Sequence, residues 1–129
     1  KKRENNTKYW SKKLSQYDDY FIIQKQSKNT KPVNFCYPLT IRKDAPFNRE
    51  MLVKFLEKNK IETRPIMAGN FIEQPVIKYI QHTKQGILPN SKLIMKNSFF
   101  FGNHHKITFQ MREFVVEKIS EFIERKLWK

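Results

Sequence analysis

Residues 48–70 have the sequence NREMLVKFLEKNKIETRPIMAGN, and this stretch decides the fold because it joins a helix, a strand and a polar loop. The apolar residues share one helical face: Leu52, Phe55 and Leu56, with Val53 beside them. This spacing predicts a helix over residues 49–59, and Asn48 is a good N-cap for it. Residues 61–66 predict a short strand that leads into the loop Ala68-Gly69-Asn70.

Upstream of this stretch, one helix and one strand are predicted. Residues 1–17 are expected to be helical because Trp10, Leu14 and Tyr17 recur at three- to four-residue spacing. Residues 27–32 form a polar loop. Residues 34–41 predict a strand, in which Pro38 indicates an edge or a bulge.

Downstream, the pattern predicts two short helices, a strand and a long final helix. The first helix covers residues 72–81, with Pro75 as its opening residue, and the next starts at residues 87–90. A strand follows at residues 98–101, and Thr108 is the expected N-cap of the final helix. The apolar stripe of that helix is Met111, Phe114/Val115, Ile119, Phe122/Ile123 and Leu127. The order of elements predicts an α/β (α+β) fold, a small sheet covered by helices, in a single domain without internal repeats.

The composition is that of a folded, strongly basic chain. It has 129 residues, 39% hydrophobic and 14% aromatic, which excludes disorder. The 26 Lys and Arg against 12 Asp and Glu give a formal charge of +14. The lysines are spread from Lys1 to Lys129, so a solubilising surface is favoured over a nucleic-acid-binding patch.

A single cysteine, Cys36, excludes an internal disulfide, and we expect it to be a small buried residue on a strand. The apolar runs are too short to span a bilayer, and no secretory signal is evident. We therefore expect a cytoplasmic protein without membrane contact. The first residue is Lys, so we also expect a piece of something longer.

Glycines are rare in this chain, and two of the three lie in polar clusters. We expect Gly69 and Gly102 to provide positive φ or close backbone approach. Arg64 lies at the end of the strand before Gly69, where its planar fork suits a carboxylate or phosphate. A surface Arg beside Glu62 is an equally good interpretation.

Asn70 and His104 are the other candidates for binding. Asn70 is a pocket-wall amide or a residue in a left-handed turn, and the turn is favoured from the residues alone. His104 faces a pocket or lies in an exposed loop, and the exposed loop is the commoner outcome. His104 and His105 are adjacent, so on extended backbone they point apart and make poor joint metal ligands. We predict no metal site. No Ser-His-Asp arrangement, Walker loop or GxGxxG is present, and no catalytic residue is identified.

The run of residues 48–70, followed by Gln74-Pro75, resembles the C-terminal domain of the DegT/DnrJ/StrS family of fold-type-I, pyridoxal-phosphate-dependent enzymes. Its form is most similar to the NDP-4-keto-6-deoxyhexose 3-dehydrases of lipopolysaccharide sugar synthesis. Residues 44–47, 88–90 and 97–102 and Thr108 also resemble family segments, so the likeness covers about residues 1–125. One departure is His105-Lys106, where family members often have Pro-Gly.

The resemblance implies how the chain is divided into segments and which domain of the enzyme binds the cofactor or the substrate. Residues 1–17 would be the end of the interdomain helix, residues 33–129 the small domain, and the large domain would be missing. Pyridoxal or pyridoxamine phosphate would bind in that large domain and not to this chain alone. The small domain would contribute substrate-binding groups at Arg64, Gly69, Asn70 and His104, and by itself would be inactive.

The implied substrate is a nucleotide-linked keto-deoxy sugar, which loses its C3 hydroxyl, and family members resemble each other in being homodimers. Transamination at the same ketone is the alternative within the family. Outside it, a stand-alone binding or scaffolding remnant and a basic nucleic-acid-binding module remain as hypotheses. An enzyme fragment would expose an apolar patch where the large domain packs.

Overall fold

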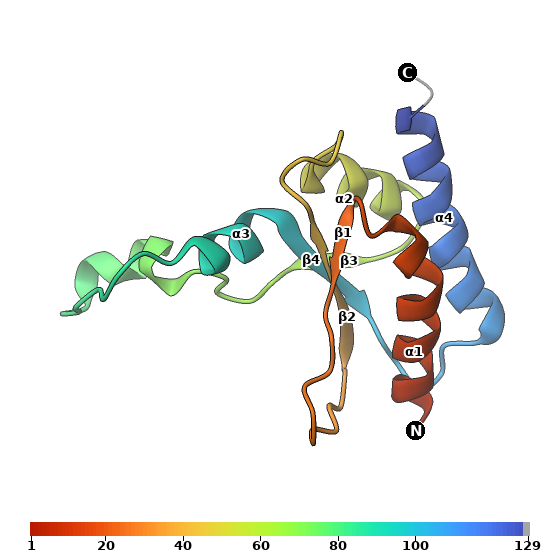
Figure 1. Cartoon of the computed structure of the whole chain (residues 1–129), viewed down its shortest axis with the longest axis horizontal. Coiled ribbons are helices and arrows are strands. Elements are labelled where there is room, and N and C mark those ends of the chain that lie inside the picture. The colour runs from red at the N-terminus through yellow and green to blue at the C-terminus, as the bar shows by residue number, and fades with distance from the viewer. Residues whose placement is uncertain (128–129) are drawn as a thin grey trace.

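The computed structural model describes residues 1–127 and contains one antiparallel sheet with helices on one of its faces (Figure 1). The strands are β1 (Phe21–Ile23), β2 (Cys36–Ile41), β3 (Thr63–Pro65) and β4 (Ser98–Gly102). Their order across the sheet is β1-β2-β4-β3, and every neighbouring pair is antiparallel. The α-helices are α1 (Lys2–Leu14), α2 (Arg49–Lys58), α3 (Pro89–Asn97) and α4 (Phe109–Leu127), with 3₁₀ turns at Ser15–Tyr17, Phe71–Glu73 and Pro75–Tyr79. The predicted α+β class is confirmed.

The core lies between one face of the sheet and helices α1, α2 and α4. Alternate residues of β2 and β4 point into it, because successive side chains of a strand point to opposite faces. The strand residues of the core are Tyr37, Leu39, Ile41, Phe99 and Phe101. The helix residues are Trp10, Leu14, Leu52, Leu56, Val115, Ile119, Phe122 and Ile123. In the part of the chain that the structure describes, no helix of this core lies on the opposite face of the sheet, and we call that face the open face.

Residues 66–97 form an arm that projects away from this body (Figure 1). The arm contains the two 3₁₀ turns after β3 and the helix α3. None of these three elements has a buried residue. The arm therefore has no core of its own.

The predicted caps of α2 and α4 are confirmed, and their predicted apolar faces are confirmed in part. Asn48 accepts the Met51 backbone N–H at 3.0 Å, and Thr108 accepts that of Met111 at 3.2 Å. In the predicted stripe of α4, Val115, Ile119, Phe122 and Ile123 are buried, whereas Met111, Phe114 and Leu127 are exposed. None of the helices in residues 1–127 is long and apolar enough to cross a membrane.

Three expectations about strand residues need correction. β2 is an inner strand and not an edge, but its pairing with β1 ends at Leu39, so the missing N–H of Pro38 costs no bond to β1. Gly102 lacks positive φ, and a Cβ built on it meets nothing within 4 Å. Its extended backbone pairs with Cys36, which is half-buried because it points to the open face.

Candidate functional site: the Arg64–Asn70 loop

The edge strand β3 positions Arg64. Thr63 is buried toward the core and pairs with Phe101, so the next residue, Arg64, lies on the open face opposite Phe100. Arg64 also lines a groove of about 840 Å³ between β3, β4 and the first turns of α4. The guanidinium is therefore placed where a ligand can reach it.

In this chain Arg64 is bound to its neighbour Glu62. Its Nη2 and Nε donate to Glu62 Oε1 at 2.6 and 3.1 Å, and the two side chains are 68% and 76% exposed. Such an exposed pair contributes little to stability, about 0–1 kcal/mol. The carboxylate of Glu62 therefore accepts from the same guanidinium N–H groups of Arg64 that would bind a substrate anion.

The turn after β3 depends on Gly69. Gly69 has φ +54°, and Ala68 before it has φ +59°. A Cβ at Gly69 would lie 2.7 Å from Cβ and Cγ of Met95 on α3. Positive φ or close backbone approach was predicted for this glycine, and the structure shows both.

Asn70 is buried, but the predicted left-handed turn is wrong for it. Its φ is −111°, an extended conformation, because Ala68 and Gly69 have already reversed the chain. Its backbone carbonyl accepts the Glu73 N–H at 3.0 Å, which starts the first 3₁₀ turn. As a whole, Asn70 is 5% exposed.

Two residues that hold this loop were not identified from the sequence. Gln74 donates from Nε2 to the Ala68 carbonyl at 2.7 Å, which closes the loop across six residues. Arg49 donates from Nη1 to the carbonyls of Met95 at 2.7 Å and Ser98 at 3.2 Å. Arg49 thus fixes the end of α3, the segment against which Gly69 packs. Gln74 and Arg49 both belong to the motif that carries the resemblance, but their partners are not visible in the sequence.

His104 lies in an exposed turn after β4. Its Nδ1 accepts the Lys106 backbone N–H at 3.3 Å. Desolvation lowers the pKa of His104, and the positive charges of His105, Arg3 and Lys106 act in the same direction. The expectation that the two histidines point apart is wrong, because a turn replaces extended backbone and brings their rings to 4.0 Å between centroids. Residues 1–127 contain no group of three His, Cys, Asp or Glu that could hold a metal ion.

Gly69 and Asn70 follow Arg64 within six residues of the chain, and the structure leaves His104 away from Gly69. Gly69 packs on Met95, which precedes β4, whereas His104 follows that strand. A strand of this length separates its two ends by about 15 Å. The candidate site is therefore the Arg64–Asn70 loop, and His104 lies at the other end of the sheet.

Replacing Gly69 with alanine is expected to lower the free energy of unfolding by about 2 kcal/mol, because a Cβ is strained at positive φ and overlaps Met95. Gly86 is the matched control, since it has φ +68° but nothing within 4 Å of a built Cβ. Gly86→Ala should cost about 1 kcal/mol or less. Urea unfolding of both variants measures the difference, and equal losses would contradict the packing of Gly69 on Met95.

The sequence of this chain was compared with family models and with known proteins. The model of the DegT/DnrJ/EryC1/StrS aminotransferase family matches residues 1–120. The lipopolysaccharide biosynthesis protein RfbH of Salmonella typhimurium is 32% identical over 120 residues, which are 93% of this chain and 28% of RfbH.

Solved structures share the fold. The GDP-4-keto-6-deoxy-D-mannose-3-dehydratase of E. coli, solved with bound hydrated PLP, aligns with a TM-score of 0.81 and 30% identity, over 90% of this chain and 29% of that one. The sugar aminotransferase CalS13 of Micromonospora echinospora aligns with a TM-score of 0.74 and 19% identity, over 93% and 30%, which shows the fold alone. The chain spans less than a third of the length of each of these proteins. With a family model that matches nearly its whole length, the chain belongs to the DegT/DnrJ/EryC1/StrS aminotransferase family.

Proposed function

We propose that this chain is the small, C-terminal domain of an enzyme that removes the C3 hydroxyl from an NDP-4-keto-6-deoxyhexose in lipopolysaccharide sugar synthesis. The observation that carries the proposal is that the chain has a higher sequence identity to a dehydratase than to an aminotransferase of the same fold. Identity is 30% with the E. coli 3-dehydratase and 19% with the aminotransferase CalS13, over nearly the same share of the chain. A common fold accounts for the aminotransferase likeness, whereas the higher identity favours dehydration.

In this proposal the chain divides into two parts. Residues 1–17 are the end of the helix that joins the domains, and residues 33–129 are the small domain itself. The larger remainder of the enzyme binds pyridoxal or pyridoxamine phosphate and completes a homodimer. That cofactor supplies the electron sink for the loss of the hydroxyl, and the protein supplies binding and orientation.

The role of this chain is to bind and orient the substrate. Arg64 exchanges its contact with Glu62 for an anionic group of the sugar nucleotide or of a cosubstrate. Gly69 allows the loop to turn tightly, and Asn70 offers an amide to a sugar hydroxyl or to the edge of the cofactor. His104, at the far end of β4, reaches the same ligand only if the ligand extends along the sheet. Arg64 and the Gly69–Asn70 turn are therefore the primary binding group.

The substitution Arg64→Ala tests this role. In the complete enzyme we expect the KM of the anionic substrate to rise about 10- to 100-fold, because a charged hydrogen bond contributes about 1.5–3 kcal/mol. Stability should change by less than about 0.5 kcal/mol, since the pair with Glu62 is exposed. Steady-state kinetics and urea unfolding provide the two measurements.

Arg125 is the matched control, because it is 67% exposed and paired with Glu121 on α4, away from the loop. Arg125→Ala should leave KM unchanged. An unchanged KM in Arg64→Ala as well would remove Arg64 from the binding site.

Mass spectrometry of the product tests the reaction itself. The complete enzyme, with pyridoxal phosphate, an amino donor and a GDP- or dTDP-linked 4-keto-6-deoxyhexose, is expected to form a product that lacks the C3 oxygen. A product with an amino group in place of the C4 ketone would instead identify an aminotransferase. Intact substrate would reject both activities.

A further inference from the structure

The open face of the sheet carries apolar side chains that are not buried in the core formed by residues 1–127. Ile22 is 40% exposed on β1, and Phe35 is 54% exposed just before β2. The rings of Phe35 and Phe100 make an edge contact with 6.0 Å between centroids. The covered face, by contrast, buries nearly all of its aromatic and aliphatic side chains.

The arm continues this apolar surface. It carries large apolar side chains that are 38–88% exposed: Met67, Phe71, Val76, Tyr79, Ile80, Ile87, Leu88 and Ile94. Short helices and turns without buried contacts are marginal in water, because most helical stability in proteins comes from packing. Exposed apolar side chains in such number, on elements without a core, mark an interaction surface.

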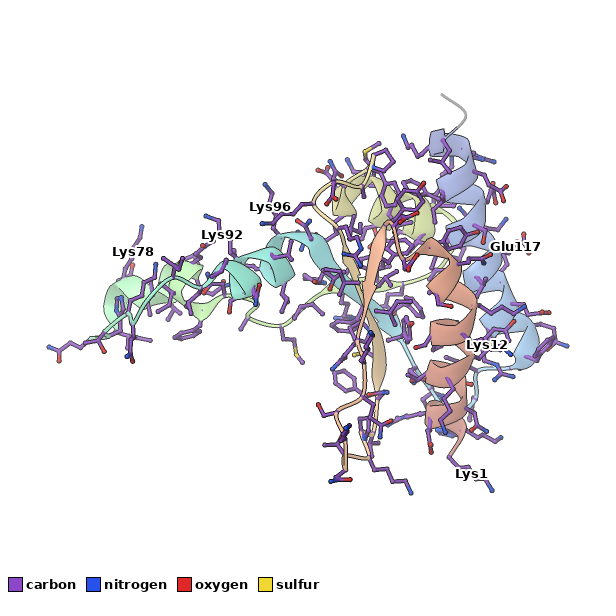
Figure 2. The ribbon with its side chains drawn as sticks, viewed as in Figure 1. Lys1, Lys12, Lys78, Lys92, Lys96 and Glu117 are labelled. Carbon is purple, nitrogen blue, oxygen red and sulfur yellow. The ribbon has the colours of Figure 1, made fainter. Side chains whose placement is uncertain are left out.

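The two faces of α3 differ in chemistry. Lys92 and Lys96, four residues apart, share one face, and Figure 2 shows them on the same side of the arm as Lys78. Asn90 and Ile94 lie on the opposite face, where they line a groove of about 550 Å³ with Ile22, Pro38 and Thr40 of the open face. We call this surface the corner: it consists of Ile22, Pro38 and Thr40 on the open face together with Ile66 and Ile94 on the arm. The charged lysines favour contact of their side of the arm with water, whereas the apolar residues of the corner favour burial against another surface.

From this geometry we infer that the corner is the surface on which the cofactor-binding remainder of the enzyme packs, an inference that rests on the proposed function. The chain spans 28% of RfbH and 29% of the E. coli dehydratase, so in those relatives more than two thirds of the protein lies outside the matching region. A second copy of this chain is a poorer occupant, because two surfaces of a chain with a net charge of +14 repel each other. Packing at the corner would also order the arm and, with it, the Gly69–Asn70 turn.

Hydrogen exchange tests this placement. Amide exchange is measured in the complete gene product and in the 129-residue chain. Residues 66–97 are expected to exchange at least tenfold more slowly in the complete protein. The last turn of α4 is the internal control, because Leu127 is also exposed but lies away from both the corner and the Arg64 groove, and its exchange should not change. Equal exchange of the arm in both proteins would overturn the inference.

A pair of variants separates burial of the corner from a general loss of folding. Ile94 is 41% exposed and Leu127 53% exposed, so we expect Ile94→Asp and Leu127→Asp to leave the unfolding midpoint of the chain nearly unchanged. In the complete protein Ile94→Asp should lower the midpoint clearly, and Leu127→Asp should not. Equal midpoints for the two complete variants, or self-association of the chain that Ile94→Asp abolishes, would contradict the inference.

These outcomes are distinct from a failure of the proposed function. A complete protein that protects the arm but converts no sugar would retain the interface and reject the activity. A complete protein that forms the deoxygenated product with an unprotected arm would retain the activity and reject the interface.

Discussion

Replacing Trp10 with alanine is expected to lower the free energy of unfolding by about 3–5 kcal/mol. Trp10 is fully buried at 0% exposure, and its ring contacts Tyr37 and Phe101 with centroid distances of 5.4 and 4.9 Å. Its indole N–H donates to the Arg112 carbonyl at 3.2 Å. The side chain therefore joins α1 to the sheet and to α4, and its removal leaves a cavity and breaks the bond of α1 to the Arg112 carbonyl. Chemical denaturation followed by circular dichroism measures the loss.

Tyr79 is the control for Trp10, because it is an aromatic residue that is 88% exposed on the arm. In the chain alone, Tyr79→Ala should change stability by less than about 0.5 kcal/mol. A small effect at Trp10 would show that α1 is not packed on the sheet.

Replacing Asn103 with alanine is expected to lower the free energy of unfolding by about 3 kcal/mol, because it removes all the hydrogen bonds of a buried amide side chain at once. Asn103 is 1% exposed. Its Nδ2 lies within 3.1 Å of the Arg3 carbonyl, Thr7 Oγ1 and the Asn34 carbonyl, and its Oδ1 accepts from Asn6 Nδ2 at 3.0 Å. These contacts connect the first two turns of α1 to the segment before β2 and to the residue after β4.

Asn97 is the control for this network, because its side chain makes a single bond to the Ile41 carbonyl at 2.9 Å. Asn97→Ala should cost about 1 kcal/mol. If Asn103→Ala cost no more than that in thermal or urea unfolding, the shared network would not contribute to stability.

The sequence predicts those features of the fold that depend on neighbouring residues. The caps at Asn48 and Thr108 and the buried pair Leu52 and Leu56 are confirmed, because capping and helical spacing are local properties. Pro75 opens a short helical segment as predicted, although the segment is a 3₁₀ turn and not an α-helix. The order of the predicted elements indicated a small sheet covered by helices, and this is confirmed.

Features decided by contacts distant in the sequence were predicted less well. The same argument from rare glycines succeeds at Gly69, where Met95 lies 2.7 Å from a built Cβ, and fails at Gly102, where nothing lies within 4 Å. Ala68 adopts a left-handed conformation that its residue type does not favour, and this displaces the turn from Asn70.

In the candidate site, the resemblance identified the Arg64–Asn70 loop but not what holds it in place. The bonds of Gln74 to Ala68 and of Arg49 to Met95 depend on how α2, α3 and the loop meet in space. The expectation that one site includes His104 came from motif positions, whereas the length of β4 separates His104 from Gly69. Which elements lie at the same end of a sheet follows from strand order, and the residues alone did not provide that order.

The intact mass and absorbance spectrum of the protein purified from its source organism test most directly whether this chain is the small domain of a cofactor-dependent sugar dehydrase. We predict a mass well above the 15.7 kDa of this chain, together with the absorbance of bound pyridoxal or pyridoxamine phosphate. A mass of 15.7 kDa without that absorbance would contradict the assignment, and the function would then have to be one of binding.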